Sequence, residues 1–342
     1  MTTARRPVPD AADAEPTAGW RDARLHIVTG KGGTGKTTIA AALALALAAG
    51  GKRTLLVEVE GRQGIAQLFD VPPLPYGDRR IAEAPRGGEV YALAVDAEEA
   101  LLEYLEMFYR LGRAGRMLKR LGAIDFATTI APGVRDVLLT GKVKEATTRT
   151  EKGRRAYHAV VLDAPPTGRI GRFLNVTAEV AGLTKVGPIK SQSDSVANLL
   201  RSPMTAVHVA TLLEDMPVQE TLDAISELRR LRLSVGAVIV NMTRAPLLAE
   251  AKLTQAALRR GLSSAGLPTD RDTVTGLLTE ARDHQARLAQ EAELREQLHT
   301  AGRPVLELAY LTDGVDLSAL YTLADLLASR GATPAGTSPD PG

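Results

Sequence analysis

The sequence predicts an α/β fold, a doubly wound and mostly parallel sheet with an inserted helical subdomain. Three observations predict it. Short apolar runs bounded by glycine alternate with longer helical patterns, which is typical of strand–helix–strand units. A glycine-rich loop at 30–38 follows the first apolar run and opens an alanine- and leucine-rich helix pattern. A long helical pattern, at about 97–150, then stands between two expected core strands.

The composition allows one large domain of this kind. A chain of 342 residues can bury a full core, and its 44% hydrophobic and 24% charged residues are ordinary for a globular protein. The net charge of +2 is too balanced to predict nucleic-acid binding. No apolar run of membrane-spanning length occurs, and we expect a cytoplasmic protein. Because the chain has no cysteine, a disulfide framework and a CxxC zinc site are excluded.

The expected strands are continuous apolar runs of the buried, parallel type, apart from an antiparallel or edge pair at 79–83 and 90–95. In chain order the other strands are 25–29, 54–59, 157–162, 206–212, 235–240 and 304–310. The expected helices are 36–49, those of the insert at about 97–150, further segments at about 170–203, 217–231, 246–260, 270–299 and 317–329. Residues 23–330 form the expected domain, and 1–22 and 331–342 are expected to be disordered tails.

The loop at 30–38 has the sequence of a phosphate-binding loop in its structural context. Its glycines let successive backbone N–H groups face an anion, and the helix that follows adds the positive end of its dipole. Lys36 then reaches the β- and γ-phosphates, and Thr37 is placed to put its hydroxyl on Mg²⁺. The expected nucleotide-binding residues of the loop are Gly32, Gly33, Thr34, Gly35, Lys36, Thr37 and Thr38.

The strand at 157–162 ends in a carboxylate, Asp163. The carboxyl ends of parallel strands meet at one edge of the sheet, so Asp163 is expected to lie near the glycine loop and to orient Mg²⁺ through a bound water. Thr37 and Asp163 are therefore the expected metal-site residues.

Lys31 directly follows Gly30, which gives the loop the form KGGxGKT[ST]. This form resembles the deviant phosphate-binding loop of the family that contains MinD, ParA, the nitrogenase iron protein and the arsenite-pump ATPases. In that family the early lysine crosses a dimer interface to the partner's nucleotide. The resemblance implies a P-loop NTPase fold, dimerisation, and a catalytic part for Lys31 beside Lys36.

Residues 163–174, DAPPTGRIGRFL, narrow the resemblance. They are similar to the switch II sequence DTAPTGHTLRFL of the arsenite-pump (ArsA-type) and tail-anchored-protein-targeting ATPases. The stretches 132–134 and 212–221 agree with the same branch, so the resemblance covers roughly 25–327. It implies an ATPase that couples ATP binding and hydrolysis to a client or partner protein. The cysteine ligands of the metalloid site and of the zinc-bridged dimer are missing, so no zinc is expected.

The sequence departs from this branch at switch I. The pattern there is DPAHxLxxxF, whose aspartate positions the attacking water, and counting back from Phe69 places Glu60 at that aspartate. Glu58 lies two residues earlier, on the same face of the strand end, and the two carboxylates could hold a water or the Mg²⁺ shell. Glutamate is one methylene longer than aspartate, which predicts slow hydrolysis or hydrolysis only with a partner. Two glutamates at a solvated strand end are the structural alternative.

Two further features are candidate binding elements. Asn241 stands where the asparagine of this branch pairs with adenine, which favours ATP over GTP, and a turn-capping asparagine is the alternative. In the insert, four arginines share one helical face that could contact acidic lipid or an acidic partner, or could simply be solvated. These are Arg110, Arg113, Arg116 and Arg120.

Three functions stay open at this point. The first is a homodimeric ATPase whose closure on ATP and Mg²⁺ acts on a protein client or membrane partner at the insert. The second is a weakly or non-catalytic nucleotide-sensing subunit in a heterodimer with a paralogous ATPase, which Glu60 motivates. The third is a ParA- or MinD-like positioning ATPase, which needs a basic DNA-binding surface or a C-terminal amphipathic helix. The end of the chain, 332–342, is neither helical nor basic in pattern, and no specific nucleic acid is expected.

Overall fold

The structure is a computed structural model that describes residues 23–109, 132–175, 188–312 and 314–332. The strands of its main sheet are β1 (Leu25–Gly30), β2 (Arg53–Glu58), β3 (Arg79–Ala84), β4 (Gly88–Ala94), β7 (Ala159–Asp163), β8 (Thr205–Thr211), β9 (Val235–Thr243) and β10 (Val305–Ala309). The helices of the described residues are α1 (Lys36–Ala48), α2 (Gly64–Leu68), α3 (Ala97–Tyr109), α6 (Pro132–Thr148), α7 (Thr167–Leu174), α9 (Pro188–Leu200), α10 (Asp215–Arg230), α11 (Gln255–Ser264), α12 (Arg271–His299) and α13 (Leu317–Ser329).

The main sheet has the strand order β10-β9-β8-β1-β7-β2-β4-β3. All neighbouring strands are parallel except β3, which pairs antiparallel with β4 at the edge. The doubly wound α/β fold and the antiparallel edge pair are thus confirmed. A short hairpin of β5 (Thr150–Glu151) and β6 (Arg154–Arg155), which the sequence did not predict, precedes β7.

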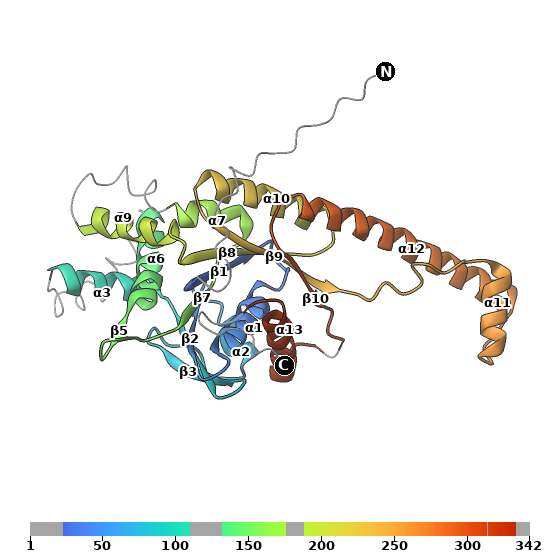
Figure 1. Ribbon diagram of the computed structural model, residues 1–342, viewed down its shortest axis with the longest axis horizontal. Helices are drawn as coiled ribbons and strands as arrows, with labels where there is room; N and C mark the ends of the chain where they lie inside the picture. The colour runs from blue at the N-terminus through green and yellow to red at the C-terminus, as the bar shows by residue number, and fades with distance from the viewer. Residues whose placement is uncertain (1–22, 110–131, 176–187, 313, 333–342) are drawn as a thin grey trace, which may run out of the picture.

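Helices cover both faces of the sheet (Figure 1). Helices α1, α2 and α13 lie on one face, and α6, α7, α9 and α10 lie on the other. Every residue of α1 from Ile39 to Ala48 is buried, because the helix is enclosed by the sheet on one side and by α13 and α2 on others. This enclosure explains why α1 is apolar all round and has no polar face.

The long helix α12 runs out from the sheet and carries α11 at its far end (Figure 1). The sequence predicts a helix at 246–260, and this prediction is wrong in its first half. Residues 246–254 form turns and irregular chain in which Leu248 has a φ of 66°. Helix α11 begins instead after Thr254, whose side chain accepts a hydrogen bond from the N–H of Ala257 and caps the helix.

The helices expected in the insert pack on the same core as the sheet. Helix α6 contacts β7, α3 and α9, and its residues Val137 and Leu139 belong to one core cluster with β1 and β7. The arginine face at 110–120 lies outside the described residues, as do 1–22 and 333–342. Ala332 is fully buried, so the packed chain continues to this residue, beyond the end expected at 330. None of the helices in the described ranges is long and apolar enough to cross a membrane.

Two histidines lie fully buried on the adjacent strands β1 and β8. The rings of His26 and His208 are stacked with centroids 5.4 Å apart, and His26 Nδ1 lies 3.1 Å from His208 Nε2. The backbone N–H of Ala237 donates to His208 Nδ1, so Nε2 is the nitrogen of His208 that carries the proton. Burial lowers the pKa of His26 to about 4 and that of His208 well below its usual value.

Acid is therefore expected to destabilise the protein. As the pH falls below about 6.5, histidines of the unfolded chain take up protons, whereas folded His26 does so only near pH 4. The free energy of unfolding falls through this window, by about 2 kcal/mol at pH 5 from His26 alone. Urea unfolding at neutral and acid pH measures the effect. His26→Gln is expected to reduce this acid response, with the remainder coming from His208, and the exposed His299→Gln to retain it in full. An equal acid response in both variants would contradict this account.

Candidate functional site

The glycine loop leaves the end of β1 and enters α1 at the carboxyl edge of the sheet. A Cβ on Gly30 would lie 2.3 Å from the carbonyl oxygen of Ala210, so only glycine fits between β1 and β8 at this point. Gly33 and Gly35 have φ values of 88° and 81°, in the left-handed region that favours glycine. The loop thus takes a backbone conformation that its glycines make possible.

Inside the loop, the backbone carbonyl of Lys31 accepts hydrogen bonds from two side chains. The hydroxyl of Thr34 donates to it at 2.8 Å, and the ammonium group of Lys36 lies 3.4 Å away from it. Lys36 is partly buried, and this burial lowers the pKa of its ammonium group. The carboxylates of Asp163 and Glu60 act in the opposite direction, so both are close enough to interact electrostatically with Lys36.

Asp163 ends β7 directly beside the start of α1. The hydroxyl of Thr37 donates to its Oδ2 at 2.7 Å, while Oδ1 is buried and accepts no hydrogen bond from the described residues. Burial raises the pKa of Asp163 to about 6; Thr37 and Lys36 oppose this shift, and Glu58 and Glu60 add to it. The two residues expected at the metal site are therefore in contact, and one buried carboxylate oxygen has room for a further partner.

Glu58 ends β2 and Glu60 follows it, and the two carboxylates contact different partners. Glu58 is only 3% exposed, and its two oxygens accept hydrogen bonds from the N–H groups of Gln63 and Ile65 at the start of α2. Each oxygen of Glu58 thus holds the backbone at the start of α2, and the shared role of Glu58 and Glu60 in holding a water or the Mg²⁺ shell stays a prediction. Glu60 instead contacts Arg169 at 3.5 Å and Arg62 at 3.6 Å.

Asn241 lies within β9, which continues to Thr243, rather than after the strand as expected. Its amide Nδ2 donates to the carbonyl oxygen of Thr34 at 3.0 Å, and a Cβ on Gly35 would lie 2.3 Å from the same nitrogen. A cavity of about 570 Å³ adjoins this asparagine and reaches Tyr310 and α12. Asn241 therefore joins the glycine loop to a cavity large enough for a nucleoside.

Lys31 turns away from the loop and pairs with a residue that sequence reasoning missed. Its ammonium group lies 2.8 Å from Glu220 Oε1 on α10, and Glu220 Oε2 accepts a hydrogen bond from Thr167 at the start of α7. One carboxylate thus links the loop lysine to the segment expected as switch II. Glu220 belongs to the stretch 212–221, which resembles the same ATPase branch. The sequence shows a carboxylate near the start of a helix there, but nothing that points to Lys31 as its partner.

Comparison with known proteins identifies the family of this chain. Residues 23–209 match the family model described as anion-transporting ATPase (ArsA_ATPase). The chain belongs to this family of ATPases. It is similar to ATPase BagA of Mycobacterium tuberculosis, at 57% identity over 317 residues that cover 90% of this chain and 93% of that protein. It is also similar to the arsenical pump-driving ATPase of Acidiphilium multivorum, at 28% identity over 88% of this chain and 48% of that protein.

Membership of the anion-transporting ATPase family confirms the ATPase activity expected from the sequence and the nucleotide as its substrate. The glycine loop, the Asp163 strand and the stretch around Thr167 all lie inside the matched region. Asn241 and Glu220 lie beyond residue 209, the end of the matched region. Their suggested roles therefore rest on the contacts described above.

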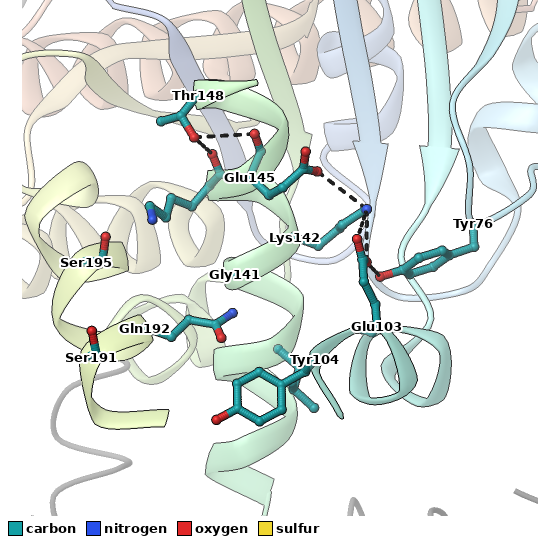
Figure 2. Close-up of a pocket in the computed structure, with 13 residues that line it drawn as sticks. Tyr76, Glu103, Tyr104, Gly141, Lys142, Glu145, Thr148, Ser191, Gln192 and Ser195 are labelled. Carbon is teal, nitrogen blue, oxygen red and sulfur yellow. Dashed lines mark hydrogen bonds and ion pairs between the residues drawn. The ribbon is translucent and has the colours of Figure 1, made fainter. Parts of the chain in front are cut away.

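A second cavity of this ATPase, of about 300 Å³, opens between α3, α6 and α9 (Figure 2). On one side Lys142 lies between Glu103 and Glu145, at 2.9 Å and 3.4 Å, and Tyr76 donates to Glu103. On the other side the side chains of α9 lie over α6, where a Cβ on Gly141 would meet the amide of Gln192. The cavity lies in the helical layer, away from the glycine loop.

Proposed function

We propose that this chain is a nucleotide switch that binds ATP with Mg²⁺ at the glycine loop and closes with a second subunit when ATP is bound. The observation that carries the proposal is the contact between Thr37 and Asp163, whose buried Oδ1 accepts no hydrogen bond from the described residues and whose carboxylate interacts electrostatically with Lys36. Thr37 and Asp163 would hold the ion, the latter through a water. Bound Mg²⁺ neutralises charge on the β- and γ-phosphates.

The remaining loop residues follow from this placement. Backbone N–H groups of residues 32–38 would face the phosphates, and Lys36 would leave the carbonyl of Lys31 for the β- and γ-phosphates. Asn241 would bind adenine in the adjoining cavity, with its amide held in place by Thr34. A switch that consumes ATP fits the cytoplasm, where ATP is supplied.

Closure with a second subunit would require Lys31 to leave Glu220. The pair is exposed to about a third on both sides, at 31% and 35%, and such pairs contribute at most about 1 kcal/mol. A nucleoside triphosphate bound to the partner carries several negative charges, so it would outcompete the single carboxylate of Glu220 for the ammonium group of Lys31. Glu220 also accepts a hydrogen bond from Thr167, so the departure of Lys31 would change the charge balance around the carboxylate that holds the start of α7.

Glu220→Gln is expected to ease this closure. The change removes the negative charge that holds Lys31 and keeps an oxygen that accepts from Thr167. The dimer should form at an ATP concentration up to about fivefold lower, since about 1 kcal/mol is lost from the open state. Light scattering during an ATP titration measures this. Asp223→Asn, three residues further along α10, is the matched control; equal midpoints for both variants would contradict the proposed part of Glu220.

A weakly catalytic subunit that pairs with a paralogous ATPase is the second candidate, because two arginines hold Glu60. Affinity purification of the tagged wild-type chain with Mg²⁺ and a non-hydrolysable ATP analogue, followed by mass spectrometry, distinguishes the two. Recovery of this chain alone supports a homodimer, and recovery of a paralogue supports a heterodimer. A protein client or membrane partner on the helical layer would be recovered in the same experiment.

A further inference from the structure

A hollow of about 210 Å³ lies between the residues after β2, the start of α6 and helix α7. Its polar lining consists of three arginines and two carboxylates, and none of the comparisons gives it a role. Residues that line it include Glu60, Arg62, Arg135, Pro165, Arg169 and Phe173.

The charge of this hollow favours an anion. Arg62 and Arg169 both approach Glu60, at 3.6 Å and 3.5 Å, so one carboxylate faces two guanidinium groups. Arg135 lines the same hollow from the first turn of α6, and no ion pair joins it to another side chain of the described residues. Guanidinium groups bind oxyanions through pairs of charge-assisted hydrogen bonds. The hollow therefore offers an oxyanion more donors than its own carboxylates use.

The position of the hollow relates it to the nucleotide loop. Glu60 forms part of its wall and also acts electrostatically on Lys36 and Asp163. Pro165, two residues after Asp163, lines it as well, and its carbonyl accepts a hydrogen bond from Thr29 at the base of the glycine loop. Glu60 and Pro165 thus connect the hollow to the residues around the glycine loop.

We propose that this hollow is an oxyanion subsite that receives the orthophosphate released from ATP. The inference rests on ATP binding at the glycine loop as proposed above. Orthophosphate is a tetrahedral anion, and it would compete with Glu60 for Arg169 and pair with Arg135. The buried side chain of Phe173 gives the hollow an apolar wall.

Direct binding tests the subsite without turnover. Potassium phosphate is titrated calorimetrically into the full chain loaded with ADP and Mg²⁺, against potassium chloride of the same ionic strength. Arg135→Gln is expected to weaken phosphate binding about tenfold, the loss of one charge-assisted hydrogen bond. Arg154→Gln, which removes the same charge from the exposed β5–β6 hairpin outside the hollow, should bind phosphate as the wild type does. Equal affinities of the two variants, or no phosphate binding by the wild type, would overturn the subsite.

The source of the phosphate is a separate question with its own measurement. Phosphate release is followed with a fluorescent phosphate sensor and compared with ATP cleavage in quenched samples of the same variant. If the product passes through the hollow, Arg135→Gln should release phosphate faster after cleavage than Arg154→Gln, because weaker binding raises the rate of dissociation. Unchanged release would overturn the exit route. Failure of the wild type to bind ATP would count against the proposed function, whereas the phosphate titration decides the subsite by itself.

Discussion

Lys36→Ala is expected to abolish ATP turnover, with a fall in rate at least on the order of a hundredfold. In the proposed complex this ammonium group is the loop cation that the chain itself places on the β- and γ-phosphates of its own nucleotide. Its partly buried site and its electrostatic contact with Asp163 and Glu60 leave no second lysine to replace it among the described residues, since Lys31 is paired with Glu220. Release of phosphate by the purified chain measures the effect.

The matched control for this change is Lys252→Ala. Lys252 is an exposed lysine before α11, far along the chain from the glycine loop, and its loss removes the same charge. Turnover of this variant should equal that of the wild type. If Lys36→Ala retained the wild-type rate, the measured activity would come from another site or from a contaminating enzyme.

Asp163→Asn is expected to remove the dependence of turnover on Mg²⁺ and to lower the rate on the order of a hundredfold. The amide keeps the size of the side chain and can still accept from Thr37, but its neutral oxygen binds the hydrated ion poorly. Because the carboxylate is buried and costly to ionise, its replacement should not destabilise the fold.

Turnover measured over a range of MgCl₂ concentrations tests this expectation, and thermal unfolding checks that the variant is folded. Glu58→Gln is a useful comparison, because it changes a nearby carboxylate that only holds the start of α2. It should lower stability and leave the Mg²⁺ dependence in place. A variant Asp163→Asn that responds to Mg²⁺ like the wild type would place the ion elsewhere.

The glycine loop and the core strands were predictable because their signals are local. The spacing of glycines around Lys36, and apolar runs such as 25–29, depend only on neighbouring residues, and β1 and α1 lie where the sequence placed them. The start of α11 was missed although its signal is local too. Pro246 resembles a helix start, whereas the capping residue is Thr254, eight residues later.

The partners of the charged site residues could not be predicted, because they come from distant parts of the chain. Arg169 lies 109 residues from Glu60, and Glu220 reaches Lys31 only because α10 packs beside α7. The sequence shows the charges but not which of them meet. The partners of Glu58 and Glu60 were not predicted either: Glu58 accepts from the start of α2, whereas Glu60 contacts two arginines.

The most direct test of this account is equilibrium binding of ATP to the purified wild-type chain, with and without Mg²⁺, beside Lys36→Ala and Asp163→Asn. The account predicts saturable binding that Mg²⁺ strengthens in the wild type, weak binding by Lys36→Ala, and binding by Asp163→Asn that Mg²⁺ no longer strengthens. Wild-type affinity for ATP in Lys36→Ala, or an equal effect of Mg²⁺ on all three proteins, would contradict it.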